Sequence, residues 1–247
     1  MVATIKFIVV LFSFFGMFGA ERLWPADAWR GGMSRIARNL SLAFVNFLLG
    51  PILVVPISVF AAAHGLGFRP DWWNIGLDLL LLDLWIYSWH RLNHVLPFLW
   101  RFHEVHHRDE MLDVTSALRF HFGEVTLSAL VRGILIWVFS IPLGSVLAFE
   151  TLVVLAAIFQ HSNLLLPSFL EDWLSKIIIT PGLHWIHHHA LREDTDSNYA
   201  TVLSVWDLIF KSRSPNQRVI GMKIGVEDES DLPLLDLLSK PFSPRRS

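Results

Sequence analysis

Two short stretches of the sequence decide how the chain must fold: His90-Arg91-Leu92-Asn93-His94 and His103-Glu104-Val105-His106-His107. A third stretch, His184-Trp185-Ile186-His187-His188-His189, lies far along the chain. On a helix, residues three and four apart share a face, with Cβ atoms about 5–6 Å apart, so each stretch can turn two or three imidazoles toward one point. One such histidine box cannot fill the coordination sphere of a metal ion, so several boxes must converge.

The histidine boxes are embedded in a very apolar chain. Hydrophobic residues make up 53% of the 247 residues, including 11 Trp and 19 Phe, which is far above the composition of a water-soluble domain. Charged residues make up only 17% and the formal net charge is −2, so nothing favours nucleic acid as a partner. The sequence contains no Cys, so a metal site would have to use His and carboxylates.

Five apolar segments are candidates for membrane crossings: 4–20, 40–63, 75–92, 125–141 and 144–162. A crossing needs about 20 residues. The first segment has an alternative interpretation, as a signal peptide cleaved after Ala20. Ile141-Pro142-Leu143-Gly144 predicts a turn between the last two segments, so we expect them to form a helical hairpin.

Two charged residues interrupt the arms of this hairpin. Arg132 and Glu150 stand at similar distances from the turn. An unpaired charge at membrane depth costs several kcal/mol, so one interpretation is an ion pair across the hairpin. The alternative is that Arg132 extends its guanidinium toward a lipid headgroup.

The basic residues predict an orientation in the membrane. Arginines, Arg30 among them, gather in the 21–39 and 91–123 segments, and the region after the fifth apolar segment carries most remaining Lys and Arg, including Arg245 and Arg246. By the positive-inside rule these three parts lie in the cytoplasm. We therefore expect an all-α bundle of membrane helices with its histidine boxes on the cytoplasmic side.

Four further residues are candidates for the same site. His121 and His161 stand alone near predicted membrane boundaries on the side of the boxes, and His189 extends the third box beyond its spacing. We interpret His189 as a residue that supports a ligand or faces solvent. Asp83 falls on the same helical stripe as the first box, about two turns further into the membrane. It either accepts a hydrogen bond from a ligand imidazole or satisfies a neighbour in helix packing.

The order H-x3-H, H-x2-H-H, H-x2-H-H between apolar hairpins resembles the fatty acid hydroxylase and sterol desaturase superfamily. Supporting phrases are Trp100-Arg101-Phe102-His103, Phe159-Gln160-His161-Ser162-Asn163, Asn198-Tyr199 and Trp206-Asp207-Leu208-Ile209-Phe210. The resemblance spans about 85–212. It departs from the family pattern at Phe122, Ala200 and Lys211-Ser212, where the family often has Pro, Gly and Gly-Thr.

Members of that superfamily are di-metal, oxygen-dependent membrane enzymes. The resemblance implies these metal ligands: His90, His94, His103, His106, His107, His161, His184, His187 and His188, with His121, Asp83 and His189 as additional ligands or supports. It also implies two Fe ions, dioxygen as co-substrate and an external electron donor of the ferredoxin, cytochrome or reductase type. The chain itself shows no haem-attachment motif and no Gly-rich dinucleotide fingerprint.

The fold that follows is all-α: a polytopic membrane helical bundle with a cytoplasmic, His-rich, di-metal helical cap. We expect N-terminal membrane helices at 1–74, a fatty acid hydroxylase-like catalytic domain at 75–212 and a loosely ordered, cytoplasmic C-terminal tail at 213–247.

The expected function is hydroxylation of a C–H bond in a lipid drawn from the bilayer, with desaturation by the same site as an alternative. A zinc-dependent membrane hydrolase, a second alternative, would keep its activity without oxygen. A metal transporter would place its ligands near the midplane of several spans, whereas these histidines stand at the ends of apolar segments.

Overall fold

The computed structural model describes residues 2–29 and 31–243, and every regular element within these ranges is a helix. The expected all-α fold is confirmed. Arg30, Arg245 and Arg246, which contribute to the predicted orientation, lie outside the described residues. The long helices are α1 (Val2–Leu23), α2 (Gly32–Leu53), α4 (Ile75–Val95), α6 (Phe122–Phe139) and α7 (Leu143–His161), and the short α3 (Val55–Ala63) continues α2.

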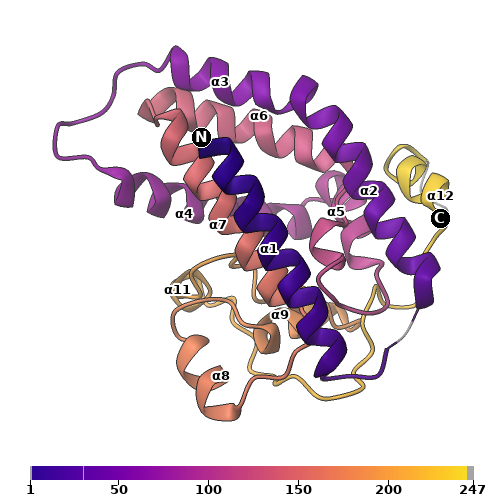
Figure 1. Cartoon of the computed structure of the whole chain (residues 1–247). Coiled ribbons are helices and arrows are strands. Elements are labelled where there is room, and N and C mark those ends of the chain that lie inside the picture. The colour runs from indigo at the N-terminus through magenta and orange to yellow at the C-terminus, as the bar shows by residue number, and fades with distance from the viewer. Residues whose placement is uncertain (1, 30, 244–247) are drawn as a thin grey trace.

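Shorter helices fill the connections and the C-terminal part. They are α5 (Pro97–His107), α8 (Ser168–Leu174), α9 (Pro181–His187), α10 (Arg192–Thr195), α11 (Val205–Ile209) and α12 (Leu234–Ser239), with single 3-10 turns η1 (Ser116–Leu118) and η2 (Lys240–Phe242). Figure 1 shows α8, α9 and α11 gathered at one end of the molecule, opposite the end that carries α3. These three short helices thus lie at one end of the bundle that the long helices form.

Four stretches of the described chain are long and apolar enough to cross a membrane: Thr4–Leu23, Gly32–Ala63, Phe122–Phe139 and Leu143–His161. They make the chain an integral membrane protein. The fifth predicted crossing, at 75–92, forms α4 but is not among them, because Asp78, Asp83 and Arg91 make it too polar. The expected count of five is therefore corrected to four candidate spans.

The second span is bent. Pro51 inside α2 and Pro56 at the start of α3 both lack a backbone donor, and the helix is interrupted at Val54 between them. α3 then packs closely on α6: a Cβ placed on Gly133 would stand only 2.7 Å from Cγ2 of Ile57. Gly133 therefore permits an approach that a larger residue would prevent.

α6 and α7 form the expected hairpin. Ser140 at its turn adopts a left-handed conformation with φ 52°. Arg132 Nη2 lies 3.0 Å from Glu150 Oε1, which confirms the ion pair across the hairpin. Lys6 of α1 also contacts this carboxylate, with Nζ 2.9 Å from Oε2, so three helices meet at one charged cluster.

α1 continues without interruption through Ala20, the position of the alternative cleavage site, to Leu23. Glu21 in its last turn is fully buried. Its Oε2 accepts the backbone N–H groups of Val114, at 3.1 Å, and Asn163, at 3.0 Å. These bonds attach the end of α1 to the loops that follow α5 and α7.

The C-terminal part differs from the loosely ordered tail that we expected. Its Asp231 accepts hydrogen bonds from Arg38, at 2.6 Å, and from Arg119. Leu237 of α12 is fully buried in a cluster with Leu42 and Val105. Up to residue 243 this segment is therefore fixed to α2 and α5, because burying Leu237 and pairing Asp231 both depend on that contact.

Candidate metal centre

A sharp corner between α4 and α5 brings the first two histidine boxes together. Pro97 begins α5, and a residue before proline avoids the helical conformation. Leu96 accordingly has φ −91° and ψ 116°, so α4 ends at Val95, directly after His94. The two boxes occupy the last turns of α4 and α5, on either side of this corner.

The remaining histidines come from the end of α7 and from α9. His161 is the last residue of α7. α9 begins at Pro181, with Thr180 as its N-cap. The indole Nε1–H of Trp185 donates to the backbone oxygen of Ser162 at 3.2 Å. This bond ties α9 to the end of α7 and places the third box beside His161.

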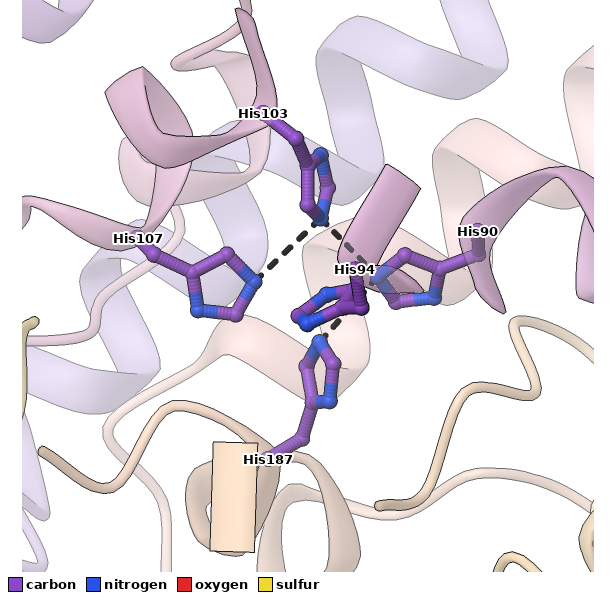
Figure 2. Close-up of side chains that lie close together, drawn as sticks. All are labelled: His90, His94, His103, His107 and His187. Atoms are coloured by element: carbon purple, nitrogen blue, oxygen red, sulfur yellow. Dashed lines mark hydrogen bonds between the residues drawn. The ribbon is translucent and has the colours of Figure 1, made fainter. Parts of the chain in front are cut away.

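The structure gathers the nine histidines implied as ligands into two groups, which we call site A and site B. Site A contains His90, His94, His103, His107 and His187, and site B contains His106, His161, His184 and His188. Within each group, one ring nitrogen of every member lies within 4.8 Å of those of the others. Figure 2 shows the five rings of site A converging on one point. Eight of the nine histidines are buried, and His90 is half-buried.

The two sites share the histidine boxes between them. Neighbouring histidines go to different sites: His106 to site B and His107 to site A, His187 to site A and His188 to site B. The rings of His107 and His188 stack with centroids 4.2 Å apart. The two sites therefore lie side by side, with one ring of each in direct contact.

Backbone hydrogen bonds fix which ring nitrogen faces each site. Carbonyl oxygens lie 2.6–3.2 Å from Nδ1 of His90, His106, His161 and His187. A carbonyl only accepts, so these rings carry their proton on Nδ1 and present the lone pair of Nε2. Yet Nε2 of His90 and Nε2 of His187 are only 3.1 Å apart, and those of His106 and His161 are 3.2 Å apart. Facing lone pairs at this distance suit a cation shared between the two rings.

Protonation of the rings does not supply that cation. Burial lowers the pKa of His187 to about 3. Burial, and then the adjacent ring of His188, hold the pKa of His107 well below its usual value. Neutral imidazoles are the form that binds metals. An all-imidazole donor set suits iron, zinc or copper rather than magnesium or calcium, so the residues present fit a pair of transition-metal ions.

Glu124, in the first turn of α6, supports site A and was missed by the sequence reasoning. Its Oε1 accepts from Nδ1–H of His103 at 2.8 Å and from Nδ2–H of Asn93 at 3.1 Å. The bond to His103 sets that ring with Nε2 toward the site. The sequence feature that could have indicated this role is a lone carboxylate at the start of an apolar segment, three residues after His121.

Asp83 lies away from both sites. Its Oδ2 accepts from the indole Nε1–H of Trp206 at 2.8 Å and from the backbone N–H of Leu203 at 3.2 Å. Asp83 thus joins α4 to α11, as in the helix-packing alternative. This hydrogen bond also gives the buried indole N–H of Trp206 an acceptor.

His121 and His189 also lie outside the two groups. His121 is the N-cap of α6: its Nδ1 accepts the N–H of Gly123 at 2.9 Å, and its Nε2–H donates to the backbone oxygen of Leu238 at 3.1 Å. Nδ1 of His189 lies 2.7 Å from Asp194 Oδ2. Both histidines therefore stabilise the local structure around the two sites through these hydrogen bonds.

A cavity of about 210 Å³ adjoins both sites. Its apolar walls include Ile86 of α4 and Val153 and Ile158 of α7, and His90 of site A and His161 of site B reach it. Pockets for complete drug-sized ligands measure about 300–1,000 Å³, so this cavity holds only a segment of a lipid. Four larger cavities among the described residues, of about 230, 270, 500 and 730 Å³, are lined by no histidine of either site.

Two buried all-histidine sites at the end of a membrane helical bundle, with an apolar cavity beside them, define a membrane metalloprotein. The sequence model of the fatty acid hydroxylase family matches residues 75–212, which is more than half of the chain, and the chain belongs to this family. No solved structure matches the chain.

Several curated relatives carry the names of lipid hydroxylases or monooxygenases. The chain is 27% identical to the ornithine lipid hydroxylase OlsE of Rhizobium tropici over 87% of its own length and 63% of the relative's. It is 30% identical to the alkylglycerol monooxygenase of Danio rerio over 58% of its length and 30% of the relative's. It is 32% identical to a cholesterol 25-hydroxylase-like protein of Danio rerio over 63% of its length and 60% of the relative's. The chain thus spans less than two thirds of each of these relatives.

Proposed function

We propose that this protein is an oxygen-dependent, di-iron membrane oxidoreductase that hydroxylates a C–H bond of a lipid. The observation that carries the proposal is the pair of adjacent all-histidine sites beside an apolar cavity. An unactivated C–H bond is beyond acid–base chemistry, so its oxidation needs a metal or another redox cofactor. The relatives named as lipid hydroxylases and monooxygenases support hydroxylation, with desaturation by the same site as the alternative.

Bound iron would supply the activation of dioxygen, with electrons from an external donor. The protein's own residues position the reactants. Carbonyl oxygens and Glu124 orient five of the nine imidazoles that would hold the ions. The walls of the cavity, Ile86 and Val153 among them, exclude water and hold methylene groups against the histidines.

We further propose an orientation and partners. The histidine boxes and the C-terminal part face the cytoplasm, as the positive-inside rule predicts. The lipid enters from the bilayer. The electron donor is a ferredoxin, cytochrome or reductase-type protein that approaches the exposed cytoplasmic surface of the short helices.

The test combines metal analysis of the purified protein with lipid mass spectrometry of cells that contain or lack it. We expect about two iron ions per chain, one for each histidine site, and a lipid that is heavier by one oxygen atom only when dioxygen is present. A lipid lighter by two hydrogens would indicate desaturation. Zinc alone, with a product that forms without oxygen, would favour a hydrolase and contradict the proposal.

A further inference from the structure

Several buried polar atoms near the metal sites have no partner within the described part of the chain. They are Oδ1 of Asn93, Oε2 of Glu124, Oε1 of Gln160 and Nε1 of Trp89, and all four residues line the cavity. We propose that these atoms bind a hydroxyl or amide group of the substrate lipid, adjacent to the carbon that is oxidised. This inference rests on the proposed function and specifies its substrate class.

The carboxylate of Glu124 is the strongest of these acceptors. Both of its protein hydrogen bonds, from His103 and Asn93, go to Oε1, although a carboxylate offers about four lone-pair positions. Oε2 is buried and unpaired. A buried charged oxygen without a donor carries a desolvation cost, which a donor on the substrate would remove.

The orientation of the Asn93 amide follows from the same carboxylate. Because Glu124 Oε1 accepts from His103 and Asn93, the Asn93 group that faces it must be the NH₂. The amide oxygen, Oδ1, therefore points away from Glu124 and remains unpaired. Asn93 and Glu124, which both line the cavity, thus each have one unpaired acceptor atom.

Two further residues that line the cavity also carry unpaired polar atoms. Gln160 on α7 is buried with its Oε1 unpaired, and the indole N–H of Trp89 on α4 is also unpaired. A set that offers several acceptors and a donor matches a group that has both functions itself. A hydroxyl has an O–H and lone pairs, and a secondary amide has an N–H and a carbonyl oxygen.

The histidines in the cavity lining place the bound hydroxyl or amide group close to the carbon that is oxidised. The cavity holds about 210 Å³ and its histidines belong to both metal sites, so a polar group bound there leaves room for only a few neighbouring carbons. The inferred substrate class is therefore a lipid oxidised near a hydroxyl or an amide, rather than at the end of a bare hydrocarbon chain.

Binding of matched lipid probes tests the inference without turnover. The two pairs are hexadecan-1-ol with 1-methoxyhexadecane, and N-methylhexadecanamide with N,N-dimethylhexadecanamide. Within each pair methylation replaces the donor hydrogen with a methyl group. Radiolabelled hexadecan-1-ol and N-methylhexadecanamide are bound to the purified, metal-loaded protein in nanodiscs and displaced by each unlabelled probe, with empty nanodiscs as background.

A hydrogen bond to a charged acceptor contributes about 1.5–3 kcal/mol, which is about tenfold or more in Kd. The donor probe of at least one pair should therefore bind about tenfold more tightly than its methylated partner. A preference in the first pair identifies a hydroxyl, and one in the second pair identifies an amide.

Variants assign the preference to the cavity. Glu124→Gln should remove it, because the new amide must turn its oxygen to Nδ1–H of His103 and its NH₂ toward the cavity. Gln160→Leu should weaken it, because it removes one of the unpaired acceptors. Glu193→Gln repeats the carboxylate-to-amide change on the exposed surface and should leave the preference intact. The metal content of each variant is measured in parallel.

Equal binding of both members in both pairs by the unmodified protein would overturn the inference and assign the polar atoms to water. A preference that persists in both Glu124→Gln and Gln160→Leu would overturn it as well. The lipid comparison in cells decides separately on the proposed function. An oxidised lipid together with equal probe binding rejects only this inference, whereas a clear preference without any oxidised lipid rejects the proposed function.

Discussion

The role of a histidine depends on where the fold places its ring, not only on its position in a histidine box. His187 and His189 stand two positions apart in the same box, yet they have different surroundings. Nδ1 of His187 lies 2.6 Å from the backbone oxygen of Ser197, which leaves Nε2 to site A. Nδ1 of His189 lies 2.7 Å from the carboxylate of Asp194, outside both groups.

This difference predicts opposite effects on metal binding. His187→Ala should lower the metal content of the purified protein by at least one ion per chain and abolish product formation, because site A loses a donor. His189→Ala is the matched control and should keep its metal. The measurement is elemental analysis alongside an assay of membrane insertion. A fully loaded His187→Ala protein would remove this residue from the site.

Asp83 should contribute to stability rather than to metal binding. Asp83→Ala leaves the buried indole of Trp206 and the backbone N–H of Leu203 without their acceptor, at a cost of about 1–3 kcal/mol for each buried group left unpaired. We expect a lower thermal midpoint in detergent with an unchanged metal content. Asp172→Ala, at an exposed position of α8, is the control. Loss of metal in Asp83→Ala would instead support the ligand-orienting interpretation.

At the scale of elements, the charged cluster of α1, α6 and α7 should be a main determinant of how these helices assemble. Glu150→Gln leaves Lys6 and Arg132 without their shared carboxylate. A cation at membrane depth without a partner costs on the order of 2.5–3.5 kcal/mol, so the free energy of unfolding should fall by about that amount.

Denaturation in mixed micelles measures this effect. The double variant Lys6→Met with Glu150→Gln should recover part of the lost stability, since one of the two unpaired cations is removed. An unfolding free energy of Glu150→Gln equal to that of the unmodified protein would show that both cations extend to the headgroups.

Much of this element-level organisation follows from local sequence. The apolar segments locate α1, α6 and α7, and the Pro142 turn locates the hairpin, because these features depend on neighbouring residues. The contact of Lys6 with Glu150 joins residues 144 positions apart, and no periodicity encodes such a pairing. The polarity of α4 was underestimated because Asp78 and Asp83 stand among many leucines.

At the scale of the whole molecule, metal binding should hold together parts of the chain that are distant in sequence. The two sites draw histidines from α4, α5, α7 and α9. Anything that binds only the folded state stabilises it, by about 4 kcal/mol when the free ligand is ~1,000 times its Kd. Removing the metal with a chelator should therefore lower the thermal midpoint, and adding iron should restore it. An unchanged midpoint would mean that the histidine sites form without metal.

The histidine boxes show which parts of the site the sequence can predict and which parts it cannot. Spacings such as His103 to His106 and His107 predict shared faces because helix geometry is local. The resemblance to a family supplied the set of nine histidines that the structure brings together, and their role as ligands stays a prediction. Glu124 was missed because it reaches His103 from a different helix, and the polar atoms of the cavity depend on packing that sequence does not display.

The alternation of neighbouring histidines between the two sites makes their occupancy interdependent. His106 and His107 share one peptide bond, as do His187 and His188, and each pair divides between site B and site A. An ion that enters one site orders the backbone from which the other site takes its donors, so the second ion meets a site whose conformational entropy has already been lost. Titration followed by native mass spectrometry should then show chains with no metal or with two, and few with one. Uptake of iron would be a single cooperative event, and a cell short of iron would contain fewer complete centres rather than many half-filled ones.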